Sequence, residues 1–184
     1  MNMKSFLYSL WEIFEVVLVA VIAVLFVRHF LIQPFLVSGA SMEPNFSSGD
    51  YLLIDELTYR FRDPQRGEVA VFHYPGDKSA YYIKRIIGLP GERLVLKNGS
   101  IMIFNNEYPQ GFVVNENYLP PELKTSGDKE IILKNDECFV LGDNRNYSFD
   151  SRNWGNLLKT EIIGIVRLRL WPFNKVMAVE KPIY

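Results

Sequence analysis

The sequence contains few of the residues that form disulfides, metal sites and conventional catalytic triads. Its only cysteine is Cys138, and its histidines are His29 and His73. A single cysteine excludes an intrachain disulfide and a Cys-x-x-Cys metal site, and the apolar stretch around Cys138 indicates a buried structural thiol. Because so few thiolate and imidazole ligands are available, we expect neither a metal nor an organic cofactor.

An excess of charge of one sign is also absent. The chain has 184 residues, with 20 Lys and Arg against 21 Asp and Glu, and these charges are mixed along the sequence. Without a basic stripe, nucleic acid is not an expected partner. Internal repeats and low-complexity tracts are absent as well, and the length fits one domain of ordinary size plus an appendage.

The most apolar part of the chain is its N-terminal segment. The run from Phe6 to Val27 is apolar apart from Glu12 and Glu15. Its length suits one bilayer crossing, which takes about 20 residues. A carboxylate at the centre of a bilayer costs on the order of 3 kcal/mol, so we expect both glutamates near the N-terminal interface.

Three interpretations of this segment compete. Ser38, Gly39 and Ala40 resemble the small-x-small site of a cleaved leader, but they lie too far beyond the apolar core for a usual leader. A buried core helix with apolar residues on every side fits poorly in so small a domain. We therefore predict that residues 1–30 form a single-pass membrane anchor, whose orientation the flanking positive charges barely determine.

Beyond residue 30 the pattern changes to short strand-like runs separated by Gly, Pro, Asn and Asp. Asn98 and Gly99 suit a type I′ hairpin turn, and no long amphipathic helical pattern follows the apolar segment. We predict a mainly β fold, with residues 31–184 forming a predominantly antiparallel β-sheet domain that carries an exposed insertion near 105–129. The expected strands are YLLID, EVAVFHY, YYIKRIIGL, RLVLK, SIMIFN, EIILK, ECFVLG and EIIGIVRLRLW.

Ser41 lies among small residues in the stretch VSGASMEPNF, which either forms an ordinary tight turn or holds a nucleophile open to a substrate. A catalytic serine hydroxyl needs a nearby base. His73 is one candidate, although a lone histidine on a strand is more often packed or at a strand end. Lys84 is the better candidate, because desolvation can remove its proton. The alternative for Lys84 is a buried stem with its ammonium group in water.

The stretch GDNRNYSFDSRNWG, residues 142–155, is rich in residues that can support a site. Its aspartates and arginines can form ion pairs, and Ser148 can orient a neighbouring group. A solvated turn is the ordinary alternative. A calcium loop is disfavoured because Arg145 occupies what would be the third ligand position.

Together these stretches resemble those of bacterial type I signal peptidases. SGASMEPNF resembles the nucleophile segment of that family, with the pattern Ser-Met-x-Pro, and RGEVAVFHYP resembles its next strand motif. YYIKRIIGLPGE resembles the general-base segment and GDNRNYSFDSRNWG the last signature. A single motif would be weak evidence, whereas all of them in family order after an apolar N-terminal segment are highly specific.

The resemblance implies roles for the residues at matching positions. Ser41 would be the nucleophile and Lys84 the general base. Ser148 would hydrogen-bond and orient the lysine amine, while Asp150 and Arg152 would form a supporting ion pair. The other residues that it places at the site are Asp143 and Arg145, which would shape the same region, and Phe35, Val37, Gly39, Tyr82 and Ile83, which would line shallow substrate pockets.

The sequence departs from the family pattern at two places. Some members carry a serine two residues before the nucleophile that helps form the oxyanion hole, but Gly39 stands there. The hole would then depend more on backbone N–H groups, including that of Ser41. Asn146 and Tyr147 stand where an Asp-Asn pair is common, which puts any role of that pair in doubt.

The expected function is therefore that of a membrane-bound serine endopeptidase. It would remove signal peptides from translocated preproteins by cleaving after a small residue at an Ala-x-Ala-like site, on the extracytoplasmic side of the plasma membrane. The expected partners are signal peptides, the lipid bilayer and a nearby secretion translocon.

Two rival functions remain open from the residues alone. A self-cleaving repressor with the same Ser-Lys chemistry would need a DNA-binding helical domain, and none is visible. In a membrane-anchored β binding module the same motifs would no longer catalyse, but the intact set of Ser41, Lys84 and Ser148 argues against it.

Overall fold

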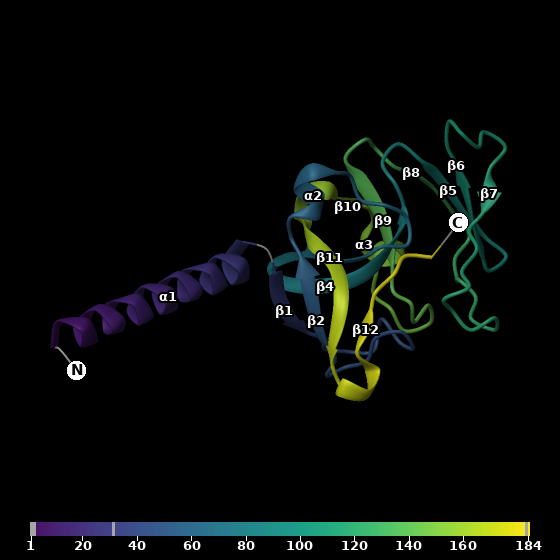
Figure 1. Ribbon diagram of the computed structural model, residues 1–184. Coiled ribbons are helices and arrows are strands. Elements are labelled where there is room, and N and C mark those ends of the chain that lie inside the picture. Colours follow the sequence, from purple (N-terminus) through teal and green to yellow (C-terminus); the bar gives the residue numbers. More distant parts are fainter. Residues whose placement is uncertain (1–2, 31, 183) are drawn as a thin grey trace.

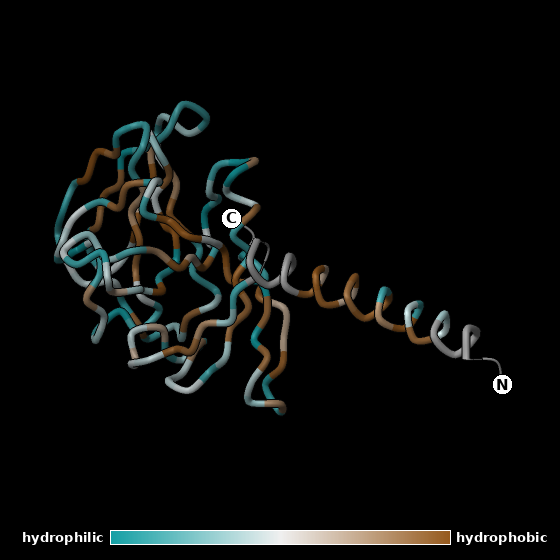
Figure 2. Tube along the Cα trace, turned by 90° about the vertical axis from the view of Figure 1, so that its left-hand side faces the viewer, coloured by the Kyte–Doolittle hydropathy of each residue, from teal (hydrophilic) through white to brown (hydrophobic). Residues whose placement is uncertain are grey.

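The computed structural model of the chain describes residues 3–30, 32–182 and 184. Helix α1 (Met3–Phe30) projects away from a β domain that contains the other elements (Figure 1). Figure 2 shows hydrophobic residues along the middle turns of α1 and hydrophilic residues on many of the loops of the domain. The mainly β, antiparallel fold expected from the sequence is confirmed.

The membrane-spanning anchor predicted for residues 1–30 is not found. Among the residues that the structure describes, no helix is both long enough and apolar enough to cross a membrane. Glu12 and Glu15 interrupt the apolar run in the sequence. The expected boundary between anchor and domain falls at residue 31, which lies outside the described residues, as do residues 1 and 2.

The larger of the two sheets has 8 strands in the order β1-β2-β11-β3-β4-β9-β10, and β12 pairs with β11. Every pairing in it is antiparallel. Its strands are β1 (Ile32–Leu36), β2 (Tyr51–Asp55), β3 (Val69–Tyr74), β4 (Asp77–Gly88), β9 (Glu137–Leu141), β10 (Leu157–Leu158), β11 (Ile162–Trp171) and β12 (Met177–Ala178).

The smaller sheet has 4 strands in the order β7-β6-β5-β8 and lies at the far side of the domain from α1 (Figure 1). Its strands are β5 (Arg93–Lys97), β6 (Ser100–Phe104), β7 (Phe112–Val113) and β8 (Lys129–Ile132). The remaining elements are the short helices α2 (Thr58–Phe61) and α3 (Ser151–Trp154) and the 3-10 turns η1 (Lys159–Glu161) and η2 (Phe173–Lys175).

Each strand-like run of the sequence corresponds to a strand. YLLID and RLVLK match β2 and β5 at both ends, and the other runs differ by a few residues at their ends. The short strands β1, β7, β10 and β12 were not predicted. Each of them is at most 5 residues long and lacks a distinct alternation, so its pairing depends on neighbours distant in sequence.

Strand β3 is buried on both of its faces. Val71 packs with Met42 in one apolar cluster, and Phe72 packs with Cys138 in another. The expectation of a buried structural thiol at Cys138 is confirmed. Because β3 is enclosed in this way, its neighbour β4, which carries Lys84, is fixed along its length by backbone pairing.

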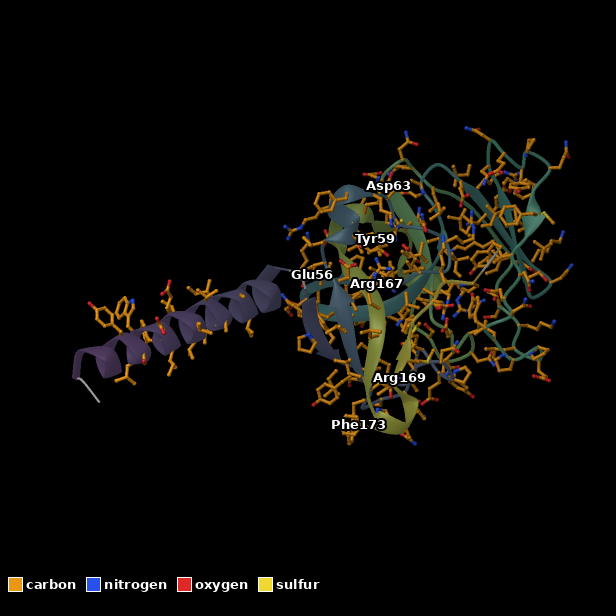
Figure 3. The ribbon with its side chains drawn as sticks, viewed as in Figure 1. Glu56, Tyr59, Asp63, Arg167, Arg169 and Phe173 are labelled. Atoms are coloured by element: carbon orange, nitrogen blue, oxygen red, sulfur yellow. The ribbon has the colours of Figure 1, made fainter. Side chains whose placement is uncertain are left out.

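Strand β11 fixes the turn that follows Ser41. Arg169 projects from β11 (Figure 3), and its Nη1 donates to Asp50 Oδ2 at 3.0 Å and to the Asn45 carbonyl at 2.7 Å. Asp50 Oδ2 also accepts from the Ser47 N–H at 3.0 Å. The turn is therefore attached to the central sheet by a buried ion pair as well as by apolar packing.

The segment 105–129, predicted as an exposed insertion, is only partly exposed. Most of its side chains face solvent, but Val114, Leu119 and Thr125 are buried. The segment also contains strand β7, which extends the smaller sheet. Its apolar residues are widely spaced among polar ones, which is why the sequence pattern gave no sign of this packing.

The β5–β6 hairpin supplies a test of the fold. Asn98 and Gly99 have φ values of +52° and +79°, as the predicted type I′ turn requires. Since alanine is strained at positive φ, Gly99→Ala should lower the free energy of unfolding in urea by about 1 kcal/mol. Asn98→Gly is the matched control and should leave it nearly unchanged. Equal stability of the Gly99→Ala protein and the wild type would contradict this account of the turn.

Candidate active site

Ser41 is held at the surface by a turn whose other side is buried. Met42 and Phe46, which follow it, are buried in the apolar cluster beside β3. Gly39 has a φ of +95°, a conformation that other residues adopt only with strain. Asn144 donates its backbone N–H to the Ser41 carbonyl and its side-chain amide to the Ala40 carbonyl, both at 3.0 Å. The backbone around Ser41 is therefore fixed by the buried Met42 and Phe46 and by the hydrogen bonds from Asn144.

Lys84 lies next to Ser41 in space although 43 residues separate them in the chain. Its Nζ donates hydrogen bonds to Ser41 Oγ at 2.7 Å and to the Ile83 carbonyl at 2.9 Å. Lys84 is only 3% exposed, and its Nζ lies 5.3 Å from the ring centroid of Tyr82. The amine is therefore enclosed by apolar groups and directed at the serine hydroxyl.

Burial lowers the pKa of Lys84 from 10.5 to about 8, and the nearby carboxylates of Asp150 and Asp143 oppose part of this shift. The cause is desolvation, which penalises the charged ammonium form. Above about pH 8 the amine is mostly neutral and can accept a proton. An arginine at this position would stay charged and could not accept a proton, so this site needs a lysine to act as a base.

The expected Asp150–Arg152 ion pair is present. Arg152 Nε and Nη2 donate to the two carboxylate oxygens of Asp150 at 2.8 Å each. Asp150 is also the N-cap of helix α3, where it forms a capping box with Asn153, and it accepts the Gly142 N–H at 3.1 Å. One buried carboxylate therefore begins the helix and fixes the start of the 142–155 stretch.

The hydrogen bond predicted between Ser148 and Lys84 is not present. Ser148 Oγ is buried and has no hydrogen-bond partner among the residues that the structure describes, because the Lys84 amine is directed at Ser41 and the Ile83 carbonyl. Ser148 nevertheless lies at the site. A Cβ added at Gly142 would clash with both Ser148 Oγ and the Ser41 carbonyl, so these backbones approach closely.

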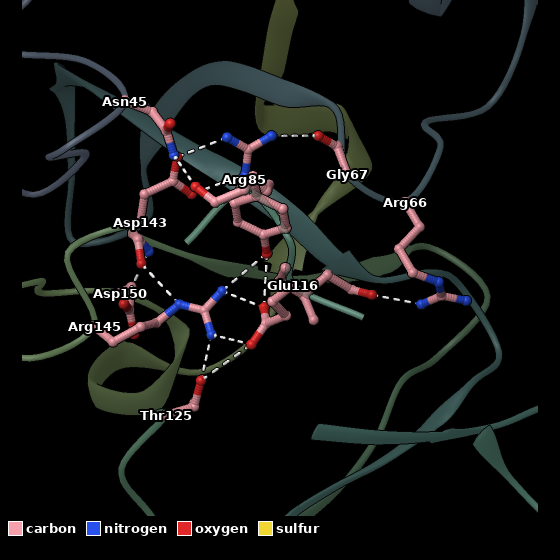
Figure 4. Close-up of polar contacts among 12 residues, drawn as sticks. Asn45, Arg66, Gly67, Arg85, Glu116, Thr125, Asp143, Arg145 and Asp150 are labelled. Carbon is pink, nitrogen blue, oxygen red and sulfur yellow. Dashed lines mark hydrogen bonds and ion pairs between the residues drawn. The ribbon is translucent and has the colours of Figure 1, made fainter. Parts of the chain in front are cut away.

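Asp143 and Arg145 lie at the same region but pair with residues that the sequence did not indicate. Asp143 accepts from Arg85 Nε and Nη2 at 2.8 and 2.6 Å, and Arg145 pairs with Glu116 (Figure 4). Lys84 and Arg85 are adjacent cations on β4 that differ in their partners. Among the described residues no carboxylate is hydrogen-bonded to Lys84, whereas Arg85 binds Asp143. The difference depends on Asp143, which lies 58 residues from Arg85 in the chain and binds Arg85 in the folded domain.

Ser41 and Lys84 are among the residues that line an apolar groove of about 480 Å³. All the residues expected to contact substrate line it: Phe35, Val37, Gly39, Tyr82 and Ile83. Other side chains of the groove, to which the sequence pattern gave no role, include Leu52, Val71, Tyr81, Tyr147 and Phe149. Tyr147, one of the departures from the family pattern, is 81% exposed at the edge of the groove.

His73, the alternative base, is engaged elsewhere. Its Nδ1 lies 2.7 Å from the Lys78 carbonyl oxygen, and its ring packs on Tyr81 at 5.0 Å between centroids. Lys84, in contrast, is hydrogen-bonded to Ser41. In the part of the chain that the structure describes, no group of His, Cys, Asp and Glu could hold a metal ion.

A serine hydroxyl beside a buried, readily deprotonated amine in an open groove is what a hydrolase with a serine nucleophile requires. Comparison with known proteins agrees with this class. The family profile described as "Signal peptidase, peptidase S26" matches residues 10–171. The chain belongs to this family of serine peptidases.

Similar proteins include two that carry signal peptidase names. The chain is 36% identical over 173 residues to "Probable signal peptidase I-2" of Synechocystis sp., covering 90% of this chain and 75% of that one. It is 29% identical over 168 residues to "Signal peptidase IB" of Staphylococcus aureus, covering 85% and 87%. A solved structure, a signal peptidase I from Enterococcus faecalis, shares 26% identity with a TM-score of 0.47, covering 56% of this chain and 97% of that one.

The titration of Lys84 can be measured directly. NMR of the 13Cε resonances in protein labelled with 13C-lysine should show one lysine titrating at about pH 8, which the Lys84→Arg variant lacks. The midpoint lies below the ordinary 10.5 because burial disfavours the charged form. A Lys84 midpoint near 10.5 would mean that the amine is hydrated, contrary to the structure.

Proposed function

We propose that this chain is a serine endopeptidase that removes signal peptides from translocated preproteins, with Ser41 as nucleophile and Lys84 as general base. The observation that carries the proposal is the 2.7 Å hydrogen bond between Lys84 Nζ and Ser41 Oγ in a desolvated site. Membership of the signal peptidase family supports the reaction class. The groove beside Ser41 supports an extended peptide as the substrate.

The acylation step uses the hydrogen bond between the two residues. When Lys84 is neutral, its lone pair accepts the Ser41 hydroxyl proton as Oγ attacks the scissile carbonyl. The tetrahedral intermediate then collapses, the peptide C–N bond breaks, and Lys84 donates the proton to the leaving amine. Water activated by the same lysine hydrolyses the acyl-enzyme and frees Ser41.

The oxyanion of the tetrahedral intermediate needs hydrogen-bond donors. Gly39, two residues before Ser41, has no side chain to supply one. A Cβ at Gly39 would meet no atom within 4 Å, but its φ of +95° would strain any other residue. We propose that the Ser41 backbone N–H is a donor of this hole, because the turn that contains it is fixed by Asn144 and by the buried Met42.

Selection of a small residue before the scissile bond follows from the walls of the groove. Val37, Leu52 and Val71 are buried, so this part of the wall is formed by packed core residues that cannot move aside easily. Phe35 and Ile83 border the same groove. A large substrate side chain would clash there, whereas the small residues of an Ala-x-Ala site would fit.

We further propose that α1 associates the catalytic domain with the plasma membrane, on the extracytoplasmic side and near the secretion translocon, where signal peptides emerge. Large apolar side chains on the described part of α1 are exposed, among them Trp11 at 65% and Val16 at 69%. Exposed large apolar side chains gathered on one element are typical of contact with lipid or with another protein.

The catalytic pair predicts how variants behave. Ser41→Ala and Lys84→Ala should each lower kcat/KM for a preprotein by on the order of 10³-fold or more, because neither group works without the other. The double variant should be about as inactive as either single one. Lys84→Arg should also fail, because a guanidinium group cannot accept the hydroxyl proton.

His73→Ala is the matched control for these variants and should retain most activity, because His73 contacts Lys78 and Tyr81. The assay is the appearance of mature product from purified preprotein in detergent. Near wild-type cleavage by Lys84→Ala together with inactive His73→Ala would replace the lysine base by a histidine. Absence of cleavage by the wild type would favour a binding module.

The location predicts that the full-length protein sediments with membranes and is digested by protease added to intact spheroplasts. Replacing Trp11 and Val16 by aspartate should move a substantial fraction to the supernatant, because charge opposes contact with an apolar phase. Val113→Asp, at a residue on β7 that is 56% exposed, is the control and should leave the distribution unchanged. Protection from protease until the membrane is opened would contradict the extracytoplasmic placement.

A further inference from the structure

The Arg145 side chain is fully buried, and residues of the segment 105–129 hold it (Figure 4). Its Nη1 donates to Glu116 Oε2 at 2.7 Å, and its Nη2 donates to Glu116 Oε1. Tyr118 OH accepts from Nη2 at 3.0 Å and donates to Glu116 Oε1 at 2.7 Å. Thr125 Oγ1 also accepts from Nη1. Each partner orients the others, so the guanidinium has one arrangement.

Arg145 transmits this arrangement to the backbone beside the nucleophile. Its Nε donates to the Gly142 carbonyl at 3.1 Å, and Gly142 lies against the Ser41 carbonyl and Ser148. From the other side Asn144 donates to the Ser41 carbonyl. The loop from residue 142 to 150 therefore lies between the Ser41 turn and the Glu116 carboxylate.

Tyr118 connects the same segment to the second buried ion pair. Its ring centroid lies 4.1 Å from Arg85 Cζ, and its carbonyl accepts from Asn45 Nδ2 at 3.0 Å. The same Asn45 amide donates to Asp143 Oδ2 at 2.8 Å, where Arg85 also binds. The segment thus contacts the Arg85–Asp143 pair and also forms the ion pair with Arg145.

Building on the proposed function, we infer that Glu116, Tyr118 and Thr125 are positioning residues of the active site. They fix Arg145 and through it hold the 142–150 loop against Ser41 and Lys84. None of them touches the reacting atoms. Their contribution is to keep Gly142, Asp143 and Asp150 at constant distances from the catalytic pair.

A positioning role and general support of the fold predict different effects on the pH profile of kcat/KM. Asp150 and Asp143 raise the pKa of Lys84 against the larger effect of burial. If the loop loosens, water also reaches the amine, and because burial has the larger effect, the pKa of Lys84 rises toward its ordinary value. The acidic limb of the kcat/KM profile should then shift to higher pH. A variant that only reduces the folded fraction would lower the rate without moving that limb.

The test uses Glu116→Gln in the full-length protein, with an internally quenched peptide that contains an Ala-x-Ala site. We expect kcat to fall about 10-fold with KM within about 2-fold of wild type, because the loss is one of positioning. The acidic limb should move to higher pH, and Glu116→Asp should recover part of kcat. Glu130→Gln is the matched control, because Glu130 pairs with Arg93 on the smaller sheet and is 57% exposed.

Tyr118→Phe decides the question if Glu116→Gln does not fold, because it removes one hydroxyl and keeps the ring over Arg85. It should show the same shift of the limb with a smaller loss of kcat. A wild-type kcat and an unmoved limb in the variant that folds would overturn the inference. The proposed function fails differently: the wild type would leave the peptide intact, or Ser41→Ala would cleave it.

Discussion

Desolvation of Lys84 is the constraint on which the rest of the site depends. A lysine in water is protonated at neutral pH and cannot act as a base, whereas burial here lowers the pKa from 10.5 to about 8. That shift corresponds to on the order of 3 kcal/mol against the charged form, which the packing of the domain must outweigh. The enclosed strand β3, the pairing of β3 with β4 and the ring of Tyr82 all serve to keep this amine out of water.

The charges around the lysine are arranged so that burial dominates. Asp143 and Asp150 are both fully buried and near enough to raise the pKa of Lys84. Each is bound by an arginine through two hydrogen bonds, Asp143 by Arg85 and Asp150 by Arg152. These ion pairs hold the carboxylates in place, and burial remains the larger effect on the pKa of Lys84. The carboxylates can therefore organise the loop while the pKa of Lys84 stays below its ordinary value.

The sequence predicted much of this, and the failures have physical reasons. Strands that form distinct apolar runs bounded by polar residues or turn signals, such as β2 and β5, were predicted with their boundaries, and Asn98-Gly99 with its turn. The predicted residues Ser41 and Lys84 are in hydrogen-bond contact, and the predicted pocket residues line one groove. The partners of Arg85 and Arg145 were missed because they depend on which distant segments fold together. The Ser148–Lys84 hydrogen bond was wrong because Lys84 contacts other acceptors, and the membrane-spanning helix is not found among the described residues.

The proposed mechanism requires that the substrate acylates Ser41 with Lys84 as the base. Rapid acid quench of the enzyme with a signal-peptide substrate, followed by proteolysis and mass spectrometry, tests it directly. The account predicts that the N-terminal product is attached to the fragment that contains Ser41 in the wild type, and that Lys84→Ala gives no such adduct on the same time scale. An adduct on a different residue, or acylation of Lys84→Ala at the wild-type rate, would contradict it.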